Sequence, residues 1–155
     1  MKPMKKRIPH RIAAGGLVIN NARILLVRYQ DADEIYLAAP GGAIKDGESL
    51  RDAAEREIYE ETGIRVAVQT PIMIENIRAI RYQMVKIWYL CKYIEGVATE
   101  TGESRKEGII GVNWYTDEQL VSEKVYPEII KSMKIQGLLN FKSEIIDLGV
   151  RYANF

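Results

Sequence analysis

One glutamate-rich segment, "LRDAAEREIYEETG" at residues 50–63, constrains the fold more than any other part of the chain. Ser49 followed by Asp52 suits an N-terminal cap and Gly63 is a natural stop, so a helix is predicted over roughly 50–62. At about 100° per residue, four apolar side chains gather within an arc of about 140°: Leu50, Ala53, Ala54 and Ile58. This arc is the face that the helix is expected to bury.

Three glutamates of this predicted helix lie on or beside its packing face. Glu57 and Glu61 fall inside the apolar arc, and Glu60 lies at its edge. The i, i+3, i+4 spacing lets their oxygens converge, and unpaired carboxylates in a partly buried place repel and raise one another's pKa. A hard divalent cation such as Mg²⁺ or Mn²⁺ removes that penalty, and Mg²⁺ also bridges substrate phosphates. The pattern therefore predicts a metal site and phosphate chemistry; a solvated charged face is the alternative, which the inward direction of Glu57 and Glu61 disfavours.

Strand-like and helical segments alternate irregularly along the rest of the chain. The strands are expected at 12–19 and 22–29, joined at Asn20-Asn21, and then at 64–70, 72–80, 81–94 and 108–116. Residues 34–42 form a short apolar segment that ends at Pro40 and the Gly41-Gly42 pair. Segment 81–94 is apolar on both faces, which indicates a strand covered on both sides. Helices are expected at 117–123 and 126–139. Without a regular βαβ alternation, the order predicts an α/β fold of the α+β type, with a mixed sheet flanked by helices.

Length and charge set the class of protein. The 155 residues fit a single domain spanning 1–155, and no repeat or linker divides them. A net charge of +1 gives no overall field that favours nucleic acid or membranes. The single Cys91 excludes an internal disulfide framework, and the basic opening "MKPMKKRIPHR" lacks the apolar run of a signal peptide. We interpret that opening as a solvated tail and expect a cytoplasmic protein.

The central segment also carries a spaced motif. Gly42 is followed by five residues, Glu48, seven residues and then "REIYEETGI" at 56–64. This resembles the complete signature of the Nudix hydrolases, and "YLAAPGG" before it is similar to the usual lead-in of that family. The resemblance implies a Nudix-type α/β/α sandwich. It also implies metal-dependent hydrolysis of a pyrophosphate bond in a nucleoside diphosphate linked to another group X, with water attacking phosphorus in line.

The resemblance assigns roles to the residues of the motif. It makes Glu60 and Glu61 the principal Mg²⁺ or Mn²⁺ ligands and Glu57 either a ligand or the base that takes the proton of water. Arg56, otherwise a plain surface residue, becomes a partner that orients Glu48 and Glu57. The carbonyl group of Gly41 is expected to reach the metal. The predicted catalytic set is thus Arg56, Glu57, Glu60 and Glu61.

The family usually adds one acidic ligand from a loop well downstream. Glu107 in "SRKEGIIGVNW" matches this ligand best, and Glu100 and Glu103 on the same loop are alternatives. For each of the three, the non-functional explanation is a glutamate exposed to solvent. At position 45 members often carry an acid and this chain has Lys45. The surroundings of the metal are therefore expected to be less acidic. Activity is not in doubt, because position 45 lies outside the defining signature.

The identity of X is left open. Relatives specific for ADP-ribose tend to have a proline where Ile80 stands, and diadenosine-polyphosphate relatives tend to have a tyrosine where Tyr82 stands. Nucleoside triphosphates fit equally well. Arg28 and Tyr82 are the predicted substrate-binding residues. Candidates for base stacking, each of which core packing also explains, are Tyr29, Tyr36, Tyr82 and Trp88.

A small-molecule nucleotide is the expected partner, with a homodimer as the candidate assembly and nucleic acid not expected. A different class of function remains: a Nudix-fold module that binds a nucleotide and regulates a partner without turnover. Such a module would be free to lose motif glutamates, and this chain has all of them. It also lacks room for an added DNA-binding domain, because about 40 residues follow Trp114.

Overall fold

The computed structural model describes residue 1 and residues 7–153, and most of the basic run of the predicted N-terminal tail, residues 2–6, lies outside the described residues. Nine strands form one mixed sheet in the described part of the chain. They are β1 (His10–Asn20), β2 (Arg23–Asp31), β3 (Glu34–Ala38), β4 (Gly41–Ala43), β5 (Arg65–Arg78), β6 (Gln83–Glu95), β7 (Ile109–Tyr115), β8 (Val125–Tyr126) and β9 (Ile146–Tyr152). The helices are α1 (Leu50–Thr62), α2 (Gly102–Lys106), α3 (Asp117–Leu120) and α4 (Ile129–Leu139).

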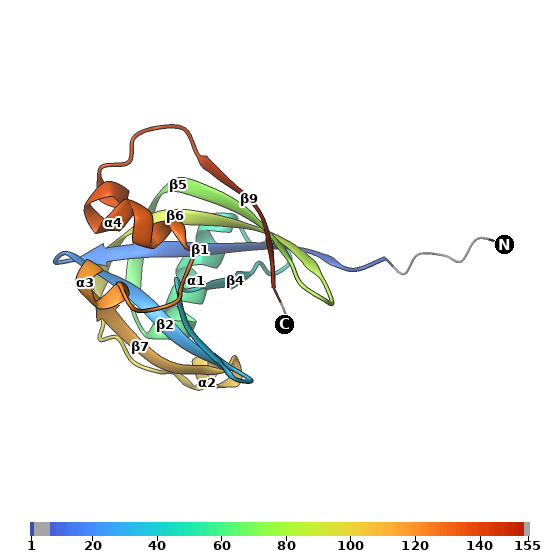
Figure 1. Ribbon diagram of the computed structural model, residues 1–155, viewed down its shortest axis with the longest axis horizontal. Coiled ribbons are helices and arrows are strands. Elements are labelled where there is room, and N and C mark those ends of the chain that lie inside the picture. Colours follow the sequence, from blue (N-terminus) through green and yellow to red (C-terminus); the bar gives the residue numbers. More distant parts are fainter. Residues whose placement is uncertain (2–6, 154–155) are drawn as a thin grey trace.

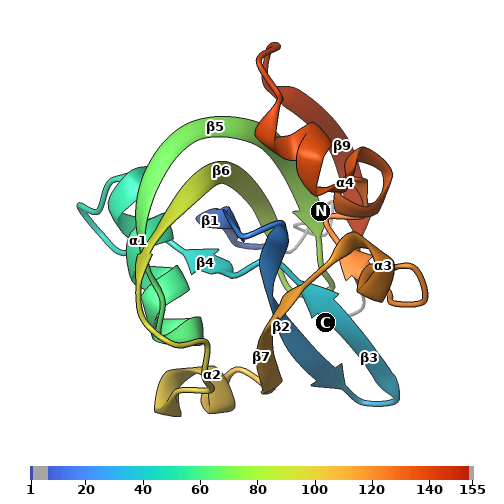
Figure 2. The same ribbon diagram turned by 90° about the vertical axis from the view of Figure 1, so that its left-hand side faces the viewer.

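The sheet runs in the order β8-β3-β2-β1-β6-β5-β9, with β4 paired to β1 and β7 paired to β2 (Figure 1). The pairs β1–β6, β3–β8 and β5–β9 are parallel, and the other pairs are antiparallel. The sheet is strongly curled, and Figure 2 shows α1 on one side of it and α3 and α4 on the other. The predicted mixed sheet flanked by helices is confirmed. None of the helices among the described residues is long and apolar enough to cross a membrane.

Two apolar clusters hold the helices on opposite faces of the sheet. On one face, Ala53, Ala54 and Ile58 of α1 pack with buried residues of β1 and β6. On the other face, α3 and α4 pack against Trp88 and further sheet residues. Strand β6 contributes to both clusters, since Trp88 and Leu90 belong to one and neighbouring residues to the other. The expectation that segment 81–94 is covered on both sides is therefore confirmed.

Helix α1 has the predicted limits and caps. The Ser49 hydroxyl accepts a hydrogen bond from the Asp52 N–H at 3.1 Å, and Gly63 ends the helix in the left-handed region at φ 75°. Glycine suits that ending because it has no side chain to clash there. The local signals therefore fixed this helix independently of the sheet that it packs on.

Several other elements differ from the predictions. The first hairpin turns at Asn21-Ala22, one residue later than predicted, since Asn20 pairs with Arg23 and both turn residues have positive φ. The two strands predicted over 64–80 form one strand, β5. Its register shifts around Pro71, which has no N–H for the ladder.

The C-terminal third was predicted least well. Helix α3 ends at Leu120 instead of residue 123, and α4 begins at Ile129 instead of residue 126, with a break at Lys134, where φ is 61°. The segment before α4 pairs with β3 as strand β8. Helix α2 and strand β9 were not predicted. Both are short, at five and seven residues, so neither shows a clear periodic pattern in the sequence.

Two glycines let β4 lie close to the central strand β1. A β-carbon at Gly41 would stand 2.5 Å from the Gly15 Cα, and one at Gly15 would stand 2.6 Å from the Pro40 carbonyl oxygen. These distances are far below van der Waals contact, so only glycine permits this approach. The approach places the inward glutamates of α1 directly beside the backbone of β4.

Candidate metal centre and substrate pocket

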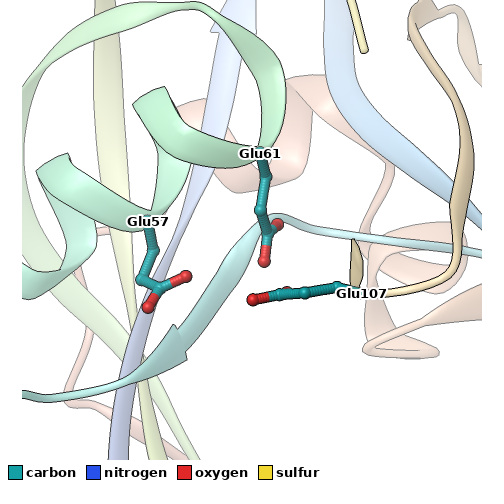
Figure 3. Close-up of side chains that lie close together, drawn as sticks. All are labelled: Glu57, Glu61 and Glu107. Carbon is teal, nitrogen blue, oxygen red and sulfur yellow. The ribbon is translucent and has the colours of Figure 1, made fainter. Parts of the chain in front are cut away.

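Three carboxylates converge at one end of the curled sheet (Figure 3). Glu57 and Glu61 come from α1, and Glu107 comes from the residue that follows α2. One oxygen of each lies within 4.8 Å of the others. Glu57 and Glu61 are only 7% and 1% exposed, while Glu107 is exposed. We call these three residues the glutamate trio.

Glu61 is the most deeply buried member of the trio. Its Oε2 accepts a hydrogen bond from the Gly41 N–H at 3.2 Å, whereas its buried Oε1 has no hydrogen-bond partner among the described residues. Burial raises the pKa of the Glu61 carboxyl well above its usual value, Lys86 opposes this rise, and Glu107 and Glu57 add to it. A buried carboxylate oxygen without a partner is costly unless a cation approaches it. The all-oxygen donor set and this unpaired atom fit a hard divalent cation.

Arg56 organises the carboxylates around the trio. Its Nε and Nη2 donate to the two oxygens of Glu48 at 2.7 and 2.9 Å, and its Nη1 donates to Glu57 Oε1 at 2.8 Å. These bonds lower the pKa of Glu48 to about 2. Burial raises the pKa of Glu57, and Arg56 counteracts that rise. Arg56 thus makes both contacts predicted for it, and it leaves Glu57 Oε2 free of a hydrogen bond to the described residues.

Glu60 lies beside the trio, not inside it. Its side chain is 33% exposed, and its Oε2 accepts a hydrogen bond from Arg56 Nη1 at 3.1 Å. The structure therefore brings together Glu57, Glu61 and Glu107 and leaves Glu60 at the edge of the group. The predicted role of Glu60 as a principal ligand stays a prediction.

Helix α2 explains why Glu107, of the three loop acids, faces α1. Thr101 and Ser104 form a reciprocal capping box, and the Thr101 hydroxyl also donates to the Glu60 carbonyl group near the end of α1. This contact docks α2 on α1 and directs the following residue to the trio. Glu100 and Glu103 instead form exposed ion pairs with Arg105 and Lys106.

We expect Glu107→Gln to lower metal-dependent activity by about tenfold or more, because it removes one charge from the metal-binding set. Glu100→Gln and Glu103→Gln are matched controls on the same loop, and each is expected to retain nearly full activity. The measurement is turnover at limiting Mg²⁺ for the three variants. Equal activity in all three would mean that another residue or water completes the site.

A pocket of about 570 Å³ lies beside the trio, and Glu107 is the member of the trio that lines it. Gly41 and Gly42 of β4 line the same pocket. All four candidates for base stacking also line it: Tyr29, Tyr36, Tyr82 and Trp88. Tyr126, which was not predicted, is a fifth aromatic residue in the lining, and its ring meets Tyr36 edge to face with the centroids 5.5 Å apart.

Arg28 does not line the pocket. Its guanidinium forms two hydrogen bonds to the Glu123 carboxylate, at 2.7 and 3.3 Å. Adjacent residues of a strand point to opposite faces, and it is the neighbouring Tyr29 that faces the pocket. The structure gives no support to the substrate contact predicted for Arg28, and its ion pair instead ties β2 to the segment after α3.

The sequence analysis missed five charged residues of the pocket lining: Asp31, Glu75, Lys86, Lys106 and Arg151. Glu75 and Lys86 interrupt strongly apolar strands, in "IMIENI" and "MVKIWYL", and an isolated charge in such a strand is a signal that could have been used. Burial lowers the pKa of the Lys86 ammonium, and the negative charges of Glu61 and Glu75 offset part of this decrease. No pattern in the sequence marked Arg151 as a pocket residue, because the strand that carries it, β9, was not predicted.

The family model described as "NUDIX domain" matches residues 9–134. A MutT-like protein of Streptomyces ambofaciens is 32% identical over 119 residues, which cover 75% of this chain and 70% of that protein. Nudix hydrolase 6 of Arabidopsis thaliana is 28% identical over 120 residues, and the match covers 74% of this chain but only 42% of that protein. The crystal structure of a NUDIX hydrolase from Nitrosomonas europaea superposes with a TM-score of 0.72 at 14% identity, covering 96% of this chain and 82% of that one.

Proposed function

The chain belongs to the Nudix family, and on that premise we propose that it is a metal-dependent hydrolase of a nucleoside diphosphate linked to another group X. The bond cleaved is a pyrophosphate bond. The observation that carries the proposal is the glutamate trio, with its unpaired Glu61 Oε1, at the end of a pocket lined by aromatic residues. Such a pocket, at about 570 Å³, has the size typical of small-molecule sites.

The trio would hold Mg²⁺ or Mn²⁺, with Glu60 and the carbonyl group of Gly41 as further proposed donors. When bound, a divalent metal supplies positive charge to the phosphoryl oxygens and lowers the pKa of the attacking water. The contribution of the chain is to fix the carboxylates in advance. Arg56 does this for Glu57 and Glu48, and the Gly41 N–H does it for Glu61.

Glu57 is the proposed proton acceptor or a further ligand. Its Oε1 is occupied by Arg56 at 2.8 Å, so Oε2 is the oxygen available for either role. Burial raises the pKa of this carboxyl, which makes it a stronger base than an exposed glutamate. Tyr29, Tyr36 and Tyr82 line the pocket at a position suited to stacking on the nucleobase.

The test is an Mg²⁺-dependent hydrolysis panel that spans nucleoside triphosphates, ADP-ribose, dinucleoside polyphosphates and nucleotide sugars. We expect turnover of at least one class, with activity abolished by EDTA and restored by added Mg²⁺ or Mn²⁺. Turnover that persists in EDTA would contradict the metal site. Tight nucleotide binding without any turnover would instead support the regulatory module.

A further inference from the structure

The two edges of the curled sheet meet beside the pocket. The edge strands are β8 and β9, and the guanidinium carbon of Arg151 on β9 lies 4.4 Å from the ring centroid of Tyr126 on β8. Both residues line the pocket. Strand β9 begins at Ile146, beyond the residues 9–134 that the family model matches. This chain therefore completes its pocket wall with a residue from outside the matched region.

Arg151 is held in place by contacts that leave its Nε–H without a hydrogen bond. Its Nε lies 3.7 Å from Glu75 Oε2, which is an ion-pair distance too long for a hydrogen bond. That Nε is buried and has no hydrogen-bond partner among the described residues. Glu75 is itself fixed, because it is 4% exposed and accepts a hydrogen bond from Trp88 Nε1 at 3.0 Å. Leaving this buried Nε–H unpaired is unfavourable, and the planar guanidinium can donate to an acceptor through its other N–H groups as well.

Lys86 is a second cation of the same pocket. Its Nζ lies 4.2 Å from the centroid of the Trp88 ring, and its charge interacts with Glu61 on the metal side and with Glu75 on the Arg151 side. The charge of Lys86 therefore interacts with members of the trio as well as with Glu75 and Arg151. Asp31 and Lys106 also line the pocket, and their charges offset each other.

The charged residues that line the pocket outside the trio carry an excess of positive charge. Lys86 and Arg151 contribute two positive charges, and Glu75 contributes one negative charge. A partly buried cation without a full partner is unfavourable, and an anionic group of the ligand would supply the missing acceptors. Phosphate matches the guanidinium fork particularly well.

We propose that Arg151 is a specificity-determining residue that binds a phosphate group of the substrate other than the diphosphate held at the glutamate trio. The proposal rests on the proposed function for the identity of the substrate. The proposal implies that either X or the nucleoside part of the substrate carries a phosphate in addition to the cleaved diphosphate. Lys86 assists by holding the same group between Arg151 and the metal end.

The first experiment needs neither metal nor turnover. Inorganic phosphate is titrated in EDTA, so that the trio has no metal with which to bind it, and Trp88 in the pocket wall reports binding by fluorescence. We expect saturable binding to the wild type and a loss of about tenfold or more in affinity for Arg151→Gln, because the charge-assisted hydrogen bonds that the guanidinium donates to phosphate are lost. Arg78→Gln is the matched control, because Arg78 is exposed on the neighbouring strand and does not line the pocket.

If Arg151→Gln does not fold, Arg151→Lys takes its place in the experiment. Lysine retains the positive charge but lacks the paired N–H donors of the guanidinium. Its affinity for phosphate should lie between those of the wild type and Arg151→Gln. Absence of saturable phosphate binding to the wild type would overturn the proposal, and so would unchanged binding in both Arg151 variants. An equal loss in Arg78→Gln would also overturn it, because the effect would then be general electrostatics.

The second experiment uses substrate pairs that differ by one phosphate outside the cleaved diphosphate, such as NADPH and NADH. Arg151→Gln should raise KM about tenfold or more for the member with the extra phosphate, and kcat should stay within about twofold. Equal effects on both members would overturn the proposal. A wild type that hydrolyses nothing in the wider panel would refute the proposed function alone, because the titration in EDTA does not depend on catalysis.

Discussion

Glutamine in place of Glu61 is expected to lower turnover by at least about a hundredfold while the fold persists. The variant keeps the size and helix propensity of the side chain but removes the charge of the most buried member of the trio. A metal ion contributes several kcal/mol of charge stabilisation to the transition state, and each 1.36 kcal/mol corresponds to about tenfold in rate. The measurement is kcat at limiting and at saturating Mg²⁺, with circular dichroism to check the fold.

The control for this experiment is Glu55→Gln, which removes a carboxylate from the exposed face of the same helix. It should have wild-type activity. Glu60→Gln tests the ligand at the edge of the trio, for which we also expect a loss of orders of magnitude. Full activity of Glu61→Gln at limiting Mg²⁺ would contradict its assignment as a ligand.

The helix that carries the trio was predictable because its signals are local. The caps at Ser49 and Gly63 and the inward direction of Glu57 and Glu61 follow from spacing within one segment, and the structure has each of them. Periodicity also placed Glu60 correctly at the edge of the buried face. These features depend on neighbours in the sequence, so a single chain contains enough information to derive them.

Other parts of the site depend on contacts between distant segments. The choice among the three loop acids is made by α2, whose docking on α1 through Thr101 was not evident from the sequence. Arg151 enters the pocket only because β9 pairs with β5, some seventy residues earlier in the chain. The sequence does not show which face of β2 lines the pocket, so Arg28 was predicted to bind substrate although it is its neighbour Tyr29 that faces the pocket. Such choices require the tertiary arrangement.

The second large effect concerns stability. Without metal, Glu57, Glu61 and Glu107 share one patch, and burial and mutual repulsion raise the pKa of Glu61 and Glu57. Ligands that are assembled in the folded chain and dispersed in the unfolded chain bind metal mainly in the folded state. Mg²⁺ or Mn²⁺ should therefore raise the free energy of unfolding, by about 2.7 kcal/mol when free metal reaches a hundred times its dissociation constant.

Glu61→Gln should change both the melting temperature without metal and the rise in melting temperature that metal produces. In EDTA the variant should melt slightly above the wild type, because a carboxylate that burial and two neighbouring carboxylates disfavour has been replaced by a neutral amide. In Mn²⁺ its rise in melting temperature should be smaller than that of the wild type, because one ligand charge is missing. Melting curves of the wild type, Glu61→Gln and the exposed control Glu55→Gln, each with EDTA and with Mn²⁺, measure both effects. A wild-type melting temperature that does not respond to saturating metal would mean that the trio is compensated without a cation, and the metal site would lose its physical basis.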